Sequence, residues 1–500
     1  MSSRCYKKNS IQNIRLLNLS MPCILLAISF VICFLINNSN AMLNQKVAYS
    51  MGFVSLVYAY LIFSTYKETG IAHFYFVFLV ISIVFYYGQH IAVILNYEYI
   101  HSQSYSIIDG IVTSDNIVNA SFLIIQCLLL LHVGYVIGLQ FNLKYKLDDS
   151  YNNVNNITSN SLINKSFVYT AWIFFVISVV PMLIMLLRQI NLTETYGYLQ
   201  RRTMESSETY YIDIGINKYV MYLSQWFLPS LYMLLISYSK KNKHRWVYLI
   251  IIAFCSLYLM TGSRYILLKV GLVIFLIQFI WIKPLNRRTT IKLLLIGLSA
   301  IVVLKAITYF RADTSAGISD LLSIISKLLD DNLICGTLWE TGITFTSISN
   351  MIQKCPSVVP YFYGKSYIGS ILCILPEFLR FGFFDKYTLT ISSTFSPLYY
   401  NTNLFGYGSS FIAEAYYNFG YFVLPVMVLF GYAIARLENK LVKAKINCNA
   451  GLFLVLVYIF AELLYGIRND LYSIPRTIVL YVGIPLLFAK LLNIIMRKKS

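Results

Sequence analysis

Charged residues are scarce in this sequence. They make up 12% of the 500 residues, whereas apolar residues make up 58% and the mean hydropathy is +0.65. A soluble domain carries about 25% charged residues, so the composition excludes an ordinary soluble fold. The apolar residues form repeated runs of about 20, the length of a helix that crosses a bilayer, without the alternation typical of barrel strands. We therefore expect an all-α polytopic integral membrane protein.

Acidic residues are also few, and the cysteines form no closely spaced pair. There are 21 Asp and Glu against 40 Lys and Arg, which gives a net charge of +19. The basic residues form small groups between apolar runs and no single block, which argues against a nucleic-acid partner and fits the enrichment of basic residues in cytoplasmic loops. The nine cysteines form no CxxC pair, so neither a metal site nor a cofactor is indicated. Cys335, Cys355 and Cys373 would allow a disulfide on an oxidising side of the membrane.

The apolar runs predict about twelve spans in a single polytopic domain, 1–500. Basic clusters follow or precede these spans on one side only, at 240–245, 283–288, 436–445 and 497–499, so we expect both termini in the cytoplasm. The first run lacks a convincing cleavage site and is expected to remain as a span. The expected spans are 21–36, 47–65, 71–95, 117–139, 167–187, 219–238, 246–260, 265–282, 291–310, 411–435, 451–465 and 475–495.

One long segment, 311–410, separates the ninth and tenth spans and is expected on the extracytoplasmic face. Within it, 318–329 carries apolar residues on one helical face and predicts an amphipathic helix on the bilayer surface. The stretch 366–380 has an apolar centre too short to span, which would dip into the interface. The remainder is rich in Tyr, Ser, Thr and Asn, a composition that suits contact with sugars and equally suits any exposed loop.

Several charged residues break the rule that cations stay on the inner side. They lie near the outer ends of spans, where a charge in lipid is costly unless it faces a polar cavity or another charge. Guanidinium groups bind phosphates through paired hydrogen bonds, so a cation-lined cavity here would suit a polyprenyl-diphosphate carrier. The alternatives are that terminal arginines only anchor the spans, and that Lys269 or Lys305 only pairs with Glu462 or Glu414. The residues are Arg201, Arg202, Arg264, Arg311, Arg468 and Arg476 at the outer face, and Lys269, Lys305, Glu414 and Glu462 within or beside spans.

Three motifs around the long segment carry a family resemblance. They are TGSR at 261–264, GSSFIAEAYYNFG at 408–420, and GIRND at 466–470, which leads into Pro475 and Arg476. In this order they resemble elements of the bacterial oligosaccharide repeat-unit polymerases, the Wzy-type O-antigen and capsule polymerases. The resemblance covers about residues 243–484.

The resemblance implies a metal-independent membrane glycosyltransferase without a cofactor. It would act in the bacterial cytoplasmic membrane and move a growing glycan from undecaprenyl diphosphate onto an incoming lipid-linked repeat unit. Glu414 is the first candidate for the general base and Asp470 the second, with Asp313 a third; Asp470 could instead orient Arg468. Expected partners are the lipid-linked oligosaccharide, the bilayer and a chain-length regulator protein. The departing diphosphate would be stabilised by Arg264, Arg311, Arg468 and Arg476, beside Lys269, Lys305, Arg201 and Arg202.

Two other functions remain open from the residues. A flippase for lipid-linked oligosaccharides binds the same carrier, but it needs charges along both leaflets, and the charges here gather toward one face. A ligase that moves a finished glycan to another acceptor would use a similar site. The residues also leave the sugars, and the choice between O-antigen and capsule, open.

Overall fold

The structure, a computed structural model, is helical throughout the part that it describes, with no strand there. Eight helical segments of this part are long and apolar enough to cross a membrane: Leu19–Asn37, Leu43–Thr69, Phe74–Ile94, Ser114–Gln140, Lys165–Tyr196, Tyr219–Tyr238, Phe411–Ile446 and Ile474–Arg497. The described residues are 2–71, 73–95, 112–146, 165–206, 218–239, 245–261, 263, 265–282, 332–375, 389, 391, 395 and 409–498.

The prediction of a polytopic helical membrane protein is therefore confirmed. Three shorter apolar helices, Arg245–Met260, Ile266–Ile282 and Ala450–Tyr465, coincide with further expected spans. The expected span 291–310 lies outside the described residues, as does the amphipathic helix 318–329. The count of twelve remains a prediction.

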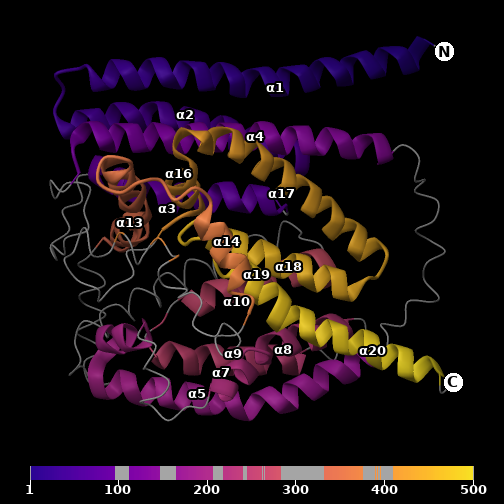
Figure 1. Ribbon diagram of the computed structural model, residues 1–500. Helices are drawn as coiled ribbons and strands as arrows, with labels where there is room; N and C mark the ends of the chain where they lie inside the picture. The colour runs from indigo at the N-terminus through magenta and orange to yellow at the C-terminus, as the bar shows by residue number, and fades with distance from the viewer. Residues whose placement is uncertain are drawn as a thin grey trace.

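The helices form two bundles that lie one above the other in Figure 1. The first bundle contains α1 (Ser2–Asn37), α2 (Leu43–Thr69), α3 (Phe74–Ile94), α4 (Ser114–Lys146), α13 (Leu333–Lys354) and α17 (Val423–Ile446). The second contains α5 (Lys165–Ser206), α7 (Lys218–Ser224), α8 (Phe227–Tyr238), α9 (Arg245–Met260), α10 (Tyr265–Leu276) with η4 (Ile277–Ile282), α18 (Ala450–Tyr465), η9 (Thr477–Gly483) and α20 (Ile484–Lys498).

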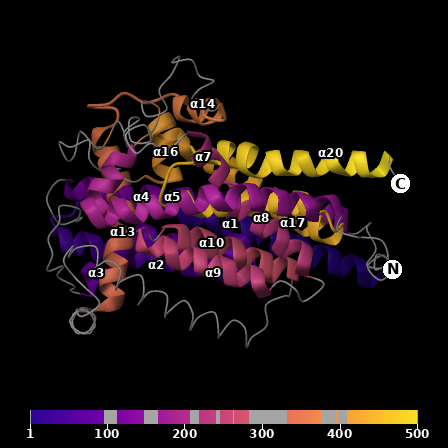
Figure 2. The same cartoon turned by 90° about the horizontal axis from the view of Figure 1, so that it is seen from below.

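Three short helices lie between the bundles: α14 (Lys365–Leu372), α16 (Phe411–Phe419) and α19 (Ile474–Arg476). The N- and C-terminal ends of the chain both lie on the same side of the molecule, at the right of Figures 1 and 2. This agrees with an even number of crossings. Which end faces the cytoplasm is still predicted from the basic clusters alone.

The first bundle packs backbone against backbone. A Cβ added at Gly134 of α4 would lie 1.9 Å from the carbonyl oxygen of Val428 in α17, and one at Gly431 would lie 1.9 Å from that of Leu131. Gly88 of α3 and Gly342 of α13 meet in the same way. Small residues at helix crossings let membrane helices approach closely and gain dispersion energy without a hydrophobic driving force.

The expectation of an exposed loop after 329 is wrong for residues 333–354. They form α13, a helix of 22 residues whose side chains Phe345, Ile348 and Met351 are buried. The many hydroxyl residues make this stretch look like a loop in the sequence. In the structure their hydroxyls donate hydrogen bonds to carbonyls of the same helix: Thr341 Oγ1 to Thr337 at 2.8 Å and Ser347 Oγ to Thr344 at 2.7 Å. A hydroxyl that is hydrogen-bonded in this way can be buried without the free-energy cost of an unsatisfied polar group.

Two smaller expectations concern α14 and the cysteines of the long segment. The eight-residue helix α14 is too short to span, as predicted, and it leaves Ile368 and Ile371 about 60% exposed (59% and 61%). An apolar face of this kind suits the membrane interface. Cys335, Cys355 and Cys373 are free thiols, so the disulfide that we considered is not formed.

Candidate functional site

The second and third motifs meet where α14, α16 and α19 lie, between the two bundles. The Phe411 amide donates to the Gly466 carbonyl at 2.8 Å, and the Ser409 amide donates to the Arg468 carbonyl at 3.3 Å. Gly466 ends α18, since its amide donates to the Glu462 carbonyl and the chain then leaves the helix. The turn 466–473 is therefore fastened along the start of α16.

Glu414 is at the centre of this junction. Ser410 caps α16 by accepting a hydrogen bond from the Ala413 amide at 3.0 Å, which sets Glu414 in the first turn. One carboxylate oxygen of Glu414 accepts from the Leu471 amide at 2.7 Å, and the other accepts from Ser366 Oγ at 2.7 Å. Glu414 is fully buried, so its two oxygens hold together α16, α14 and the turn.

Asn418 completes this network one helical turn after Glu414. Its Nδ2 donates to Ser366 Oγ at 2.8 Å and to the Glu414 carbonyl at 2.8 Å. Sequence reasoning named Glu414 but missed both Asn418 and Ser366. The i, i+4 spacing inside the motif could have indicated Asn418. No local signal could have indicated Ser366, which is 48 residues from Glu414 along the chain.

Asp470 lies beside Glu414, close enough for the two carboxylates to repel each other. It is half-buried, and its withdrawal from water raises the pKa of Asp470 to about 6. Its neighbour Arg468 is exposed, and the guanidinium carbon stands 6.0 Å from the ring centre of Phe85 in α3. The turn thus carries a carboxyl group with a raised pKa, Asp470, and an exposed arginine, Arg468.

A second charged group lies at the other end of the same turn. The Lys269 ammonium of α10 pairs with the Glu462 carboxylate of α18, and Ser473 Oγ donates to the second Glu462 oxygen at 3.4 Å. For Lys269 this is the ion-pair alternative weighed from the sequence, and its partner is Glu462, while Glu414 binds Ser366 and Leu471. The pair ties α10, α18 and the start of α19 together.

Arg476 in α19 reaches across to α7. Its Nη2 donates to Tyr222 Oη at 3.1 Å, and its guanidinium carbon is 5.4 Å from the Tyr222 ring centre. The π-helical segment η9 follows at once, and its Leu480 carbonyl accepts from Trp226 Nε1 at 3.0 Å. The widened helix and the break between α7 and α8 leave space between them.

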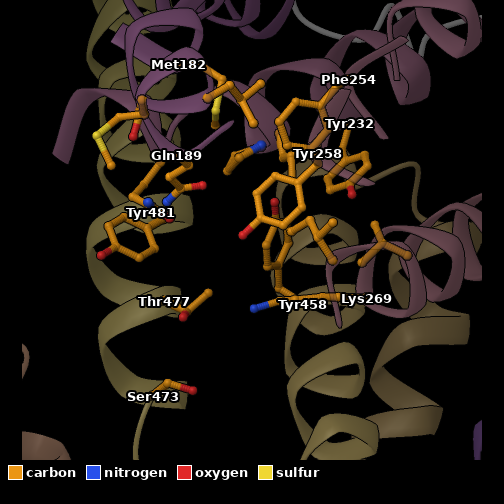
Figure 3. Close-up of a pocket in the computed structure, with 18 residues that line it drawn as sticks. Met182, Gln189, Tyr232, Phe254, Tyr258, Lys269, Tyr458, Ser473, Thr477 and Tyr481 are labelled. Carbon is orange, nitrogen blue, oxygen red and sulfur yellow. The ribbon is translucent and has the colours of Figure 1, made fainter. Parts of the chain in front are cut away.

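That space is a cavity of about 330 Å³ in the second bundle, shown in Figure 3. The one charged side chain among its lining residues is Lys269, whose positive charge is balanced by the neighbouring Glu462 carboxylate. The other lining side chains carry hydroxyl, amide, thioether, aromatic or aliphatic groups. In its described walls the cavity thus differs from the cation-lined cavity that we expected. The lining residues are Met182, Met185, Leu186, Gln189, Ser224, Gln225, Leu228, Pro229, Tyr232, Phe254, Tyr258, Ile266, Lys269, Val273, Tyr458, Ser473, Thr477 and Tyr481.

The structure brings together only some of the residues predicted for the site. Glu414, Asp470 and Arg468 share the junction, and Lys269 and Arg476 lie near the cavity. Arg201 is buried near the end of α5. No cluster of three metal-ligating side chains occurs in the part of the chain that is described. Outside the described residues or side chains lie Arg202, Arg264, Lys305, Arg311 and Asp313.

The fold and this site define a polytopic helical membrane protein with buried carboxylates beside a cavity within its second bundle. The family model for O-antigen polysaccharide polymerase Wzy matches residues 20–499, and the chain belongs to this family. It is therefore a membrane polymerase of the glycosyltransferase kind, and its substrate is a lipid-linked oligosaccharide. No curated protein and no solved structure is significantly similar to the chain.

Proposed function

We propose that the protein polymerises oligosaccharide repeat units on the outer face of the bacterial cytoplasmic membrane. The growing glycan passes from undecaprenyl diphosphate to the incoming unit, which is linked to its own undecaprenyl diphosphate. One observation carries the proposal: the hydrogen-bonded junction of segments 408–420 and 466–473 brings two carboxylates together beside a cavity that contains Lys269.

In this proposal Asp470 is the general base and Glu414 is a positioning residue. Both Glu414 oxygens already accept protein hydrogen bonds, and the side chain is shielded from an acceptor hydroxyl by its burial. Asp470 is more accessible, and a pKa of about 6 leaves it largely ionised at neutral pH and basic enough to take a proton. This reverses the order in which the sequence ranked the two.

Cationic side chains stabilise the departing diphosphate. Arg468 and Arg476 approach from the turn and from α19, and Arg264 and Arg311 are assigned the same role from the motifs. Lys269 acts from the cavity wall, and Lys305, Arg201 and Arg202 add to the local positive potential. Fixed guanidinium groups stabilise developing negative charge without reorganisation, so the reaction needs no metal ion.

The proposed product is an O-antigen or capsule polymer, and a chain-length regulator protein is the proposed partner in the membrane. A flippase for the same lipid-linked unit is the second candidate function, because it would bind the same carrier. A normally flipped but unpolymerised unit distinguishes the two.

The test is Asp470→Asn, which keeps the shape of the side chain and removes the base. We expect the polymerisation rate to fall by about 10²- to 10⁴-fold. Cells should display surface glycan of a single unit in place of a ladder, with normal amounts of protein. Glu194→Gln, the matched change at an exposed acidic residue of α5, should leave the ladder intact.

Two outcomes would contradict the proposal. A normal ladder in Asp470→Asn would remove Asp470 as the base. A lipid-linked unit trapped on the inner face, with none displayed outside, would identify a flippase.

A further inference from the structure

Helix α14 and the turn 373–375 that continues it have their faces reversed. Small residues occupy the buried positions: Ser366, Gly369, Ser370 and Cys373. Large aliphatic residues occupy the exposed positions: Ile368, Ile371, Leu372 and Leu375. A surface helix of a soluble protein shows the opposite arrangement, with its apolar side chains inward and its polar side chains toward water. The exposed face of α14 therefore needs an apolar environment outside the protein.

The position of α14 indicates which environment this is, because two candidate spans begin beside it. Ser366 Oγ donates to Glu414, which is three residues after the start of the span Phe411–Ile446. The turn after α14 contacts Tyr472 Oη, two residues before the span Ile474–Arg497. In both views α14 lies near the end of α20 that is farther from the C-terminus (Figures 1 and 2). Helix α14 is thus at the level where spans leave the membrane, and a short helix with one apolar face suits the membrane–water interface there.

The buried side of α14 is fastened to both segments of the junction. Just before the helix, the Phe362 amide donates to the Tyr417 carbonyl of α16 at 2.9 Å, and the two rings stack with centres 4.9 Å apart. Ser366 then donates to Glu414 at 2.7 Å, and the other Glu414 oxygen binds the turn 466–473. The position of α14 is therefore passed to this turn through hydrogen bonds.

Asp470 lies next to the points at which the turn is held. The amide of Leu471, the following residue, donates to Glu414 at 2.7 Å, and the side chain of Tyr472 contacts the turn after α14. These contacts fix the backbone on one side of Asp470. A displacement of about 1 Å in a catalytic group can lower a rate about 100-fold, so contacts of this kind matter for the reaction even where they do not touch the substrate.

We infer that α14 lies in the membrane–water interface on its apolar face and positions the turn 466–473 through its buried face, with Ser366 as the positioning residue. The role of Asp470 in this inference rests on the proposed function, whereas the location of α14 does not. A lipid-linked substrate is held at the bilayer surface by its own lipid. A helix anchored at the same surface gives the base a fixed height relative to that substrate.

The location is tested by fluorescence quenching of the purified full-length protein in lipid nanodiscs. A fluorophore is attached at Ile371→Cys in a cysteine-free version, and the lipids carry a spin label either at the headgroup or deep in the acyl chain. The headgroup label should quench more strongly. Leu429→Cys is the control, since Leu429 is exposed near the middle of the span Phe411–Ile446 and should show the reverse order. Quenching of Ile371→Cys by neither label would place this face in water, available to a protein partner, and would overturn the inference.

The positioning role is tested with Ser366→Ala, which removes the hydroxyl with little change in volume. In reconstituted protein kcat should fall about tenfold or more and KM should stay within about twofold, because the turn moves but no substrate contact is lost. The acidic limb of the pH–rate profile should move to higher pH, since the Glu414 carboxylate loses a donor that stabilises its ionised form. A role in folding alone would lower the amount of protein and leave this limb in place.

Ser370→Ala is the matched control for Ser366→Ala. Ser370 is also buried in α14, but its hydroxyl donates to the Tyr367 carbonyl of the same helix at 2.7 Å. The kcat and the acidic limb should therefore remain as in the wild type. A wild-type kcat and limb in Ser366→Ala, or the same change in both variants, would overturn the positioning role.

Ile371→Asn connects the location of α14 with its role. In water this exposed substitution would be harmless, but in the interface it removes apolar contact with lipid, so kcat should fall about threefold or more. Ile371→Leu keeps the apolar area and should retain the wild-type kcat. A wild-type kcat in Ile371→Asn would show that the turn does not depend on where α14 lies.

The inference and the proposed function fail separately in this design. If quenching and Ser366→Ala behave as expected while Asp470→Asn still makes a normal ladder, α14 positions the turn and Asp470 is not the base. If Asp470→Asn loses the ladder while Ser366→Ala keeps the wild-type kcat and limb, the proposed function stands and α14 does not position the turn.

Discussion

The two bundles of the molecule differ in how they are packed. In the first, glycines let α4 and α17 touch through their backbones, and α3 and α13 do the same. In the second, helices α5, α8, α9, α10 and α18 and segment η9 enclose a cavity of about 330 Å³. Empty volume forfeits dispersion energy, so a hollow bundle is stable only if the rest of the fold supports it. The first bundle is therefore a frame, and the second is the part suited to a ligand.

The two bundles also differ in what surrounds their buried carboxylates. Glu438 in the first bundle accepts from the Tyr75 amide at 3.0 Å and from Tyr135 Oη at 2.6 Å, which fastens α17 to α3 and α4. Glu462 in the second bundle pairs with Lys269, which lines the cavity. Both carboxylates hold helices together, but only the second does so where a substrate could reach its partner.

Apart from Asp470→Asn, the largest effect is expected at Arg264, which stands in the sequence between the expected spans 246–260 and 265–282. Arg264→Ala should remove about 2–4 kcal/mol of transition-state stabilisation, a hundredfold or more in rate. Surface glycan should collapse from a ladder to a single unit, and Lys should restore only part of the activity because it lacks the paired fork. A normal ladder at a normal protein level would show that Arg264 only anchors the span.

The frame itself can be tested by the same substitution in each bundle. Gly431→Ala should destabilise the protein by about 1–3 kcal/mol or more, since its Cβ would meet a backbone carbonyl that cannot rotate away. Gly271→Ala adds a Cβ with nothing within 4 Å and should be neutral or slightly stabilising. Thermal unfolding of the purified protein measures both. Because Gly271 is exposed at the surface, it is the control, and equal effects would contradict the close backbone contact at Gly431.

The pH dependence of polymerisation should report Asp470. Burial raises its pKa to about 6, and the ionised form is the base, so the rate is near maximal above pH 7 and falls as the pH drops through 6. Because Asp470 and Glu414 repel each other, the acidic limb belongs to the pair of carboxyl groups, and the rate should fall progressively as the pair takes up a proton. Rates measured on reconstituted protein between pH 4 and 8 test this. An acidic limb centred near pH 4 would mean that Asp470 is solvated like an ordinary carboxylate.

The smallest effect on activity is expected from a cysteine placed at Tyr363, near the junction of the two bundles. Tyr363 is 74% exposed and lies beside α16, so Tyr363→Cys in a cysteine-free version should leave activity unchanged. Its thiol should react with an impermeant reagent in intact spheroplasts. Reaction only after lysis would put the junction in the cytoplasm and reverse the topology.

The sequence by itself determined the class of the protein and most of its membrane helices. Long apolar runs cannot be exposed to water, and their backbone can be satisfied in lipid only as helices, so local composition is sufficient. Three short motifs were also enough to indicate the family, which the match over residues 20–499 confirmed. The hydroxyl-rich run of α13 shows the limit of this reasoning, because its polar groups bond within the helix and imitate a loop.

The site was decided by tertiary structure. Nothing near Glu414 in the chain indicates that its carboxylate binds Ser366 and the Leu471 amide, 48 and 57 residues away. The same holds for Lys269, whose partner Glu462 is 193 residues distant. Hydrogen bonds and ion pairs of this kind depend on positions to within an ångström, and those positions follow from how glycines and aromatic side chains let distant helices pack. Sequence could name the charged residues, but only the packing of the bundles decided which of them hold the turn.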